Sequence, residues 1–153
     1  MYIGTLALST VLISALKSSV FVAGKYSFRR HIWGPTNEPR PIIFFRPQHR
    51  PILHTLAQIA VYDPYAAESI QNYMDTKIPY VVRQGVATAF KAVLHRATQE
   101  SLCYLGERCG AHGLFAYNNI IDNQIEAHGN SIAEGDTLAL CISKYILKNR
   151  PGQ

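Results

Sequence analysis

The residues near the C-terminus that could do chemistry are a carboxylate and a glycine placed side by side. They stand in the stretch Ile132-Ala133-Glu134-Gly135-Asp136-Thr137, where a helical pattern begins at about Glu134. A carboxylate becomes an effective base near neutral pH when burial raises its pKa, and a neighbouring glycine leaves room for a bound molecule. A glutamate at a helix start can equally be a first-turn acid that the helix dipole favours. The residues alone leave both interpretations open.

Two further motifs combine small or basic residues within a few positions. The segment Cys109-Gly110-Ala111-His112-Gly113-Leu114 follows a long helical pattern, and its glycines either let a ligand approach the backbone or simply end the helix. Far upstream lies Arg29-Arg30-His31-Ile32-Trp33-Gly34-Pro35. Guanidinium groups bind phosphate oxygens in bidentate fashion, although at a helix end they can also make surface salt bridges only.

Together these motifs resemble the C-terminal helical domain of the acyl-CoA oxidases and dehydrogenases. The arginine run is similar to the family's R-R-Q-F/S-G-P, and the glycine segment is similar to C-G-G-x-G-Y/F, with Ala111 and Leu114 as departures. Glu134-Gly135-Asp136-Thr137 looks like the oxidases' E-G-D/E-N and the dehydrogenases' E-G-T. Asn37-Glu38-Pro39 with Pro41-Ile42-Ile43 resembles the oxidases' G-E-x-x-x-P-I-L, which makes the oxidase branch the closer relative.

The resemblance implies a role for each motif. Glu134 would be the base that removes the α-proton of an acyl-CoA. The substrate would lie against Ala133, Gly135, Asp136 and Tyr117. The flavin, whose phosphates the family's arginine reaches in a neighbouring subunit, would contact Arg29, Arg30, Gly110 and Gly113.

The resemblance covers nearly the whole chain, so residues 1–153 are interpreted as one domain that begins where the family's last domain begins. We therefore expect a partner chain to supply the flavin domains, no cofactor on the isolated chain, and FAD only in the complex. An alternative is a cofactor-free cyclase, isomerase or binding protein of a biosynthetic pathway that reuses the acyl pocket, which Ala111 and Leu114 favour. A third is a non-catalytic remnant kept for oligomerisation. Such a bundle exposes apolar surface, which predicts a homodimer or a hetero-complex.

Helical spacing of apolar residues predicts an all-α, up-and-down four-helix bundle to position these motifs. Pro51 is expected in the first turn of the second helix, with a kink or break at Asp63-Pro64, after a proline-rich connection without helical period. Leu114 to Ser131 has a mixed pattern. The four predicted helices span about Ile3 to Arg30, Pro51 to Met74, Pro79 to Cys109, and Glu134 to Lys148.

Composition narrows the class of protein. The 153 residues are 48% hydrophobic and 16% charged, enough apolar material for one core, and the basic residues behind the net charge of +5 are scattered, which argues against nucleic-acid binding. The apolar N-terminal stretch contains Lys17 and several Ser and Thr residues, so a core helix is favoured over a membrane span or a signal peptide.

Three cysteines without metal-like spacing indicate small buried side chains in a reducing compartment, and the six histidines offer no metal-ligand pair on one helix. The terminal Arg150-Pro151-Gly152-Gln153 is not a peroxisomal address of the Ser-Lys-Leu type. An intracellular, cytoplasmic protein without a metal is therefore expected.

Overall fold

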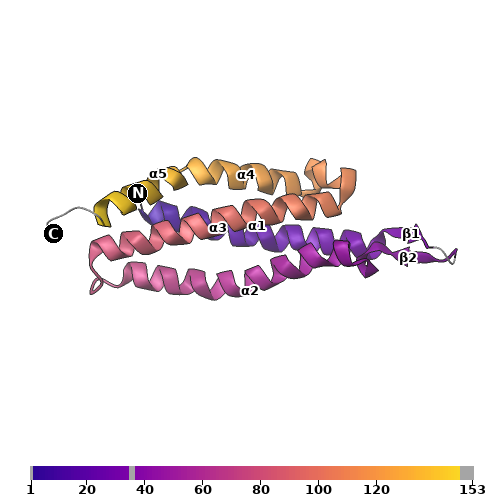
Figure 1. Ribbon diagram of the computed structural model, residues 1–153, viewed down its shortest axis with the longest axis horizontal. Coiled ribbons are helices and arrows are strands. Elements are labelled where there is room, and N and C mark those ends of the chain that lie inside the picture. The colour runs from indigo at the N-terminus through magenta and orange to yellow at the C-terminus, as the bar shows by residue number, and fades with distance from the viewer. Residues whose placement is uncertain (1, 35–36, 149–153) are drawn as a thin grey trace.

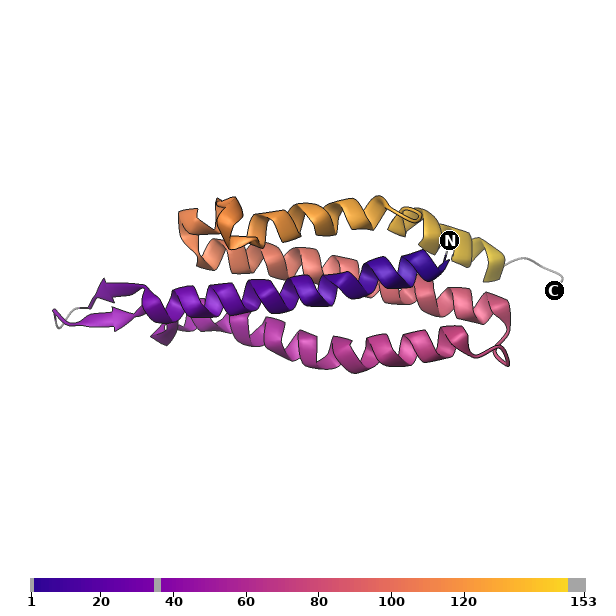
Figure 2. The ribbon, with the colours of Figure 1, turned by 180° about the vertical axis from the view of Figure 1, so that it is seen from behind.

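A computed structural model describes residues 2–34 and 37–148, and in it the chain is an elongated bundle of α-helices (Figure 1). Three helices run nearly the length of the bundle, and two shorter ones, α4 and α5, follow each other along one side and fill its fourth position (Figures 1 and 2). The three long helices alternate in direction, and α4 and α5 together run opposite to the third of them, which confirms the predicted up-and-down bundle. The helices are α1 (Tyr2–Arg29), α2 (Arg46–Met74), α3 (Tyr80–Arg108), α4 (Ile120–Ile132) and α5 (Thr137–Lys148).

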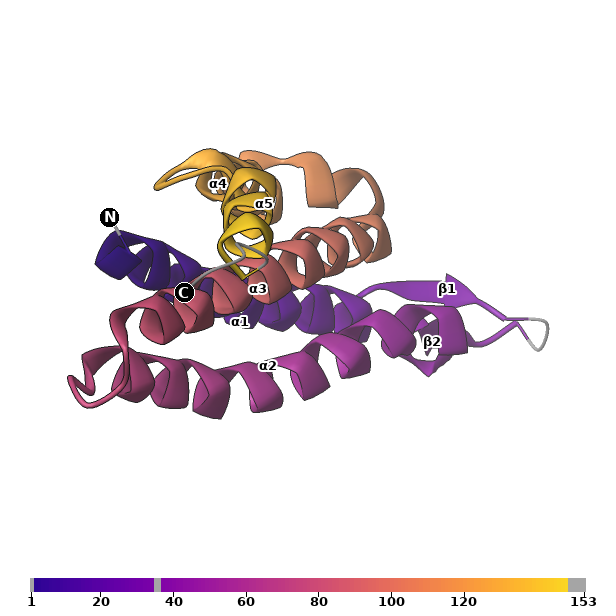
Figure 3. The same ribbon diagram turned by 60° about the vertical axis from the view of Figure 1, so that its left-hand side comes forward.

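A β-hairpin joins α1 to α2 and projects beyond the end of the bundle (Figure 3). Strand β1 (His31–Trp33) pairs antiparallel with β2 (Pro39–Pro41), so that Ile32 lies opposite Arg40. A short 3₁₀ helix, η1 (Ile42–Phe44), then leads into α2. The connection was predicted to have no helical period, and this is wrong from Ile42 onward, where η1 and the first turn of α2 lie, while residues 35–36 are outside the described part.

Helix α2 begins five residues earlier than predicted, at Arg46, and continues through both of its later prolines. Pro47 stands in the first turn, where its missing N–H would have no helical partner. Pro51 removes one hydrogen bond from the Pro47 carbonyl, which instead accepts one from Arg108 Nη1 at 3.3 Å. Pro64 does not end the helix, because Tyr62 and Ala66 on either side of it are held in the core.

The C-terminal third contains more helix than its mixed pattern indicated. Two 3₁₀ turns, η2 (Gly110–Leu114) and η3 (Ala116–Asn118), reverse the chain after α3, and α4 follows. The last helix begins at Thr137 rather than Glu134. Glu134 and Gly135 have φ values of 56° and 98°, which a right-handed helix does not accept.

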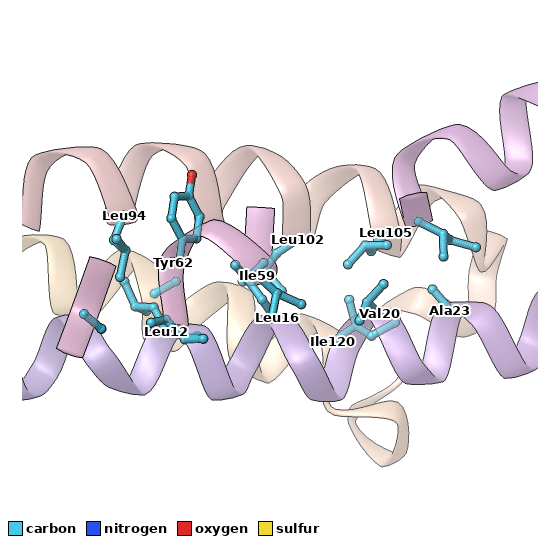
Figure 4. Close-up of a cluster of buried hydrophobic side chains, with 14 of the residues drawn as sticks. Leu12, Leu16, Val20, Ala23, Ile59, Tyr62, Leu94, Leu102, Leu105 and Ile120 are labelled. Carbon is cyan, nitrogen blue, oxygen red and sulfur yellow. The ribbon is translucent and has the colours of Figure 1, made fainter. Parts of the chain in front are cut away.

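The core changes character along the bundle. Toward the hairpin it is aliphatic, with α1 side chains facing those of α2, α3 and α4 (Figure 4). Toward the α4–α5 loop polar side chains are buried among the apolar ones. The polar residues buried there are Thr5 and Ser9 of α1 and Thr88, Lys91, His95 and Thr98 of α3.

Helix α1 is central to this packing, because it contacts α2, α3 and α4. Residues 3–29 are long and apolar enough to cross a membrane by length and composition alone. However, Leu12, Leu16 and Ala23 are buried against the neighbouring helices, as expected for a core helix.

Candidate active site at the α4–α5 loop

Glu134 lies in the loop that joins α4 to α5, in a backbone conformation that is unfavourable for its residue type. Its φ of 56° falls in the left-handed region, which costs a residue other than glycine about 1–2 kcal/mol. The following Gly135 also has a positive φ, which its lack of a Cβ permits. A strained glutamate of this kind persists only when its surroundings fix it.

Lys91 of α3 supplies the first of those constraints. Its side chain is only 1% exposed, and its ammonium group donates hydrogen bonds of 2.6 Å to the carbonyl oxygens of both Ala133 and Gly135. The two acceptors flank Glu134, so the lysine holds the loop on both sides of it. Burial lowers the pKa of Lys91, while the negative charges of Asp136 and Glu134 act in the opposite direction.

Helix α1 supplies the second constraint. The Glu134 carboxylate rests on the helix at Gly4, where an added methyl group would lie 2.7 Å from the carboxyl carbon and 3.0 Å from each oxygen. The neighbouring Thr5 hydroxyl donates a hydrogen bond of 3.4 Å to the Glu134 carbonyl oxygen. Helix α3 therefore holds the main chain of the loop. Helix α1 contacts both the main chain of the loop and the Glu134 carboxylate.

Asp136, and not Glu134, caps α5. Its Oδ1 accepts a hydrogen bond from the Ala139 amide at 3.0 Å, and its carbonyl accepts one from the Leu140 amide at 2.9 Å. Glu134 stands three residues before the helix, so the interpretation of Glu134 as a first-turn acid is wrong. Its side chain is exposed in this chain and remains available to another molecule.

His95 lies one turn along α3 from Lys91 and is buried, with 2% of its surface exposed. Within the described part of the chain, neither ring nitrogen makes a hydrogen bond of ordinary geometry, although the Ala127 backbone lies close enough to act on the ring. Burial lowers the pKa of His95 to about 4, the charge of Lys91 lowers it as well, and the Ala127 carbonyl has the opposite effect. The ring is therefore neutral at physiological pH. Sequence analysis missed both Lys91 and His95, although each interrupts an apolar helical face.

The remaining predicted site residues lie at the opposite end of the bundle, near the hairpin. The Tyr117 hydroxyl and His112 Nδ1 share a hydrogen bond of 2.7 Å. The centroid of the His112 ring lies 5.7 Å from that of the Tyr26 ring. Tyr26 is 22 residues beyond Gly4 on α1, a separation of about 33 Å along a helix. Tyr117 and Glu134 of one chain therefore cannot share a small substrate, which corrects their assignment to one pocket. Ala133, Gly135 and Asp136 do lie beside Glu134.

The two glycines predicted to contact flavin have structural roles within the chain. Gly110 follows α3 with a φ of 59° and ends that helix, as its left-handed conformation predicts. Gly113 is buried against α3, where an added methyl group would overlap the carbonyl of Gly106. The close approach of two backbones accounts for Gly113 without a ligand.

Arg29 and Arg30 are exposed where α1 meets the hairpin, and in the described residues their guanidinium groups have no protein partner. The prediction that the basic residues are scattered is wrong for the segment around the hairpin, where they are concentrated. Between residues 25 and 50 the only acid is Glu38, whereas the basic side chains are Lys25, Arg29, Arg30, Arg40, Arg46 and Arg50. This end of the molecule could accept an anionic group such as a phosphate.

Two of the three cysteines are exposed, Cys103 and Cys141, so the prediction of small buried side chains holds only for Cys109. All three thiols are free. In the residues that the structure describes, no three His, Cys, Asp or Glu side chains form a group that could hold a metal ion.

Solved structures share this arrangement of helices. Butyryl-CoA dehydrogenase from Megasphaera elsdenii matches with a TM-score of 0.79 and 14% identity over 95% of this chain and 36% of its own. The chain has the fold of a helical part of the acyl-CoA dehydrogenases and oxidases. An acyl-CoA dehydrogenase from Geobacillus kaustophilus matches with a TM-score of 0.79 and 12% identity over 95% of this chain and 36% of its own.

Acyl-CoA oxidase-1 of Caenorhabditis elegans, solved with FAD and ATP, matches with a TM-score of 0.84 and 19% identity over 94% of this chain and 23% of its own. The chain therefore spans only a quarter to a third of these enzymes' length. No protein-family pattern and no curated relative matches the sequence. At these identities the likeness establishes the fold and leaves the activity to be argued from the site.

Proposed function

We propose that this chain supplies the helical domain and the catalytic base of an enzyme similar to the acyl-CoA oxidases and dehydrogenases, acting on an apolar acyl substrate. The observation that supports it best is the position of the Glu134 carboxylate, which lies against α1 at Gly4. The backbone of Glu134 is left-handed, and hydrogen bonds from Lys91 and Thr5 to the loop main chain hold it there. A connection that only joined two helices would have no need for a strained glutamate or a buried ammonium group.

In the proposed reaction, the Glu134 carboxylate accepts the α-proton of the acyl thioester. Gly135 beside it leaves space for a planar thioester group. Because Glu134 is exposed in the chain alone, we propose that a partner polypeptide covers it and completes an apolar slot, since a carboxylate in such a slot can act as a general base. Lys91 and Gly4 hold the carboxylate in place while the proton is transferred.

Flavin enters this proposal only together with the partner chain. A bound flavin would accept a hydride from the β-carbon of the substrate. On this chain, the exposed and unpartnered guanidinium groups of Arg29 and Arg30 fit a flavin phosphate, whereas Gly113 faces the backbone of Gly106 and offers it no approach. We expect the isolated chain, which we place in the cytoplasm, to retain no FAD.

The test is reconstitution with a flavoprotein that carries the other domains of such an enzyme. The purified flavoprotein should bind an apolar acyl-CoA and keep an oxidised visible spectrum, and addition of this chain should make the substrate bleach the flavin band. If the flavoprotein reduces its flavin equally well without the chain, the chain is not the source of the base.

One observation favours the alternative of a cofactor-free cyclase, isomerase or binding protein. The contact between Gly113 and Gly106 explains the glycine motif as helix packing, which removes one reason to expect a dinucleotide. Catalysis by shape and orientation would tolerate Glu134→Gln but not Ala133→Phe, since the larger side chain fills the space beside Glu134. The opposite ranking of the two variants excludes this alternative.

A further inference from the structure

We propose that Gly4 and Lys91 are positioning residues that fix where the Glu134 carboxylate lies, one through the absence of a side chain and the other through the loop's main chain. This inference rests on the proposed role of Glu134 as a base. It assigns a purpose to two residues, on α1 and α3, that are 87 positions apart in the sequence and carry no motif.

Gly4 matters because of what a single methyl group would displace. The three atoms nearest to a Cβ at this position all belong to the Glu134 carboxyl group, with the carbon at 2.7 Å and each oxygen at 3.0 Å. That group is the far end of a flexible side chain, whereas the backbone of Glu134 is held by hydrogen bonds to Thr5 and, on both flanks, to Lys91. Gly4→Ala should therefore move the carboxylate and leave the helices in place.

Helix α1 contains a matched control for this substitution. Gly24 lies on the same helix, and a methyl group added to it would have no neighbour within 4 Å. Alanine is the better helix former at both positions, by up to roughly 1 kcal/mol in a helix interior, so neither replacement is expected to disturb α1 itself. Any difference between the two variants then reports the contact with Glu134.

Lys91 acts on the same carboxylate from the other side. Burial removes its ammonium group from water, which is unfavourable. The ammonium group donates two hydrogen bonds of 2.6 Å that offset this loss, both to carbonyls adjacent to Glu134. Without those bonds the left-handed conformation of Glu134 loses its support and the carboxylate moves away from Gly4. Gly4 and Lys91 thus depend on each other through Glu134.

The first experiment needs no partner and no substrate. In the folded chain, the side-chain carboxyl ¹³C resonance of Glu134 is assigned by its disappearance in Glu134→Gln. We expect Gly4→Ala and Lys91→Met to shift that resonance, and Gly24→Ala to leave it unchanged. An unchanged Glu134 resonance in folded Gly4→Ala would overturn the inference.

The second experiment uses the complex with the flavoprotein and separates this inference from the proposed function. We expect Gly4→Ala to lower kcat by roughly 10- to 100-fold with little change in KM, because a displacement of about 1 Å has that effect on a reacting group. Combined with Glu134→Gln it should cause no further loss, since Gly4 acts through Glu134. Full activity of Glu134→Gln would refute the base, whereas an inactive Glu134→Gln with normal Gly4→Ala would refute the positioning role alone.

Discussion

The ammonium nitrogen of Lys91 lies 2.6 Å from the carbonyl oxygen of Gly135, across the interface between α3 and the α4–α5 loop. The contact explains a charged residue on a helical face that otherwise buries Ala87, Phe90 and Leu94. Among the described hydrogen bonds, Lys91 is the only cation that donates to the main chain of this loop.

Replacing Lys91 by methionine should destabilise the chain. The variant keeps most of the side-chain volume but removes two hydrogen bonds from a charged donor, so we expect the free energy of unfolding to fall by about 1–3 kcal/mol in chemical denaturation. The exposed Lys77 offers a matched control, and Lys77→Met should change stability by less than about 0.5 kcal/mol. Equal stabilities of the two variants would contradict a structural role for Lys91.

Stability should fall in mild acid because of His95. Its pKa is about 4 in the folded chain and near 6.5 when unfolded, so between those values the unfolded state binds more protons. The free energy of unfolding should therefore be unaffected by this group above about pH 6.5, decline as the pH falls toward 4, and level off below it.

His95→Leu should remove much of that decline, by roughly 2–3 kcal/mol between pH 7 and pH 4. The exposed His54, for which the structure describes no hydrogen bond, serves as the control, and His54→Leu should keep the full pH dependence. Denaturant titrations at several pH values measure the difference, and parallel profiles for wild type and His95→Leu would exclude His95 as the source.

The glycines should differ in their tolerance of alanine. Gly113→Ala forces a methyl group into the Gly106 backbone and should cost about 1–3 kcal/mol. Gly129, inside α4 with open space around it, should gain up to about 1 kcal/mol from the same change. Thermal unfolding ranks the two variants, and a Gly113→Ala protein as stable as wild type would mean that η2 does not pack on α3 in this way.

Association of the purified chain is expected, because large apolar side chains remain on its surface. Trp33 is 72% exposed and Phe44 74%, both near the hairpin, and Leu138 on α5 is 68% exposed. Burying such surface in a homodimer or in a complex is favourable. Light scattering should show a dimer or larger species, and a strict monomer throughout the micromolar range would count against this.

The long helices were predictable because their signals are local. The limits of α1 and α3 follow from continuous helical spacing and, for α3, from the left-handed Gly110. The hairpin was not predictable, since its strands have three residues each and contain Pro39 and Pro41. The start of α2 was missed because prolines that suit a first helical turn resemble those of an irregular connection.

The site was predictable only in part. Family-like motifs placed Glu134, Ala133, Gly135 and Asp136 together, and they are adjacent in the chain. The contacts from Gly4 and Lys91 depend on which faces of α1 and α3 meet the α4–α5 loop, and helical periodicity does not specify that. Tyr117 was misplaced for the same reason, because its distance from Glu134 is set by the length of the bundle.

The central claim is that the Glu134 carboxylate removes a proton, and one substitution tests it most directly. Glu134→Gln keeps the size of the side chain and removes the base, so turnover of an apolar acyl-CoA in the complex with the flavoprotein should fall about 100-fold or more. Because Asp136 caps α5, the same variant should unfold at the wild-type temperature. Glu126→Gln, an equivalent change at an exposed position of α4, should leave turnover intact. Equal turnover by wild type and Glu134→Gln would contradict the account.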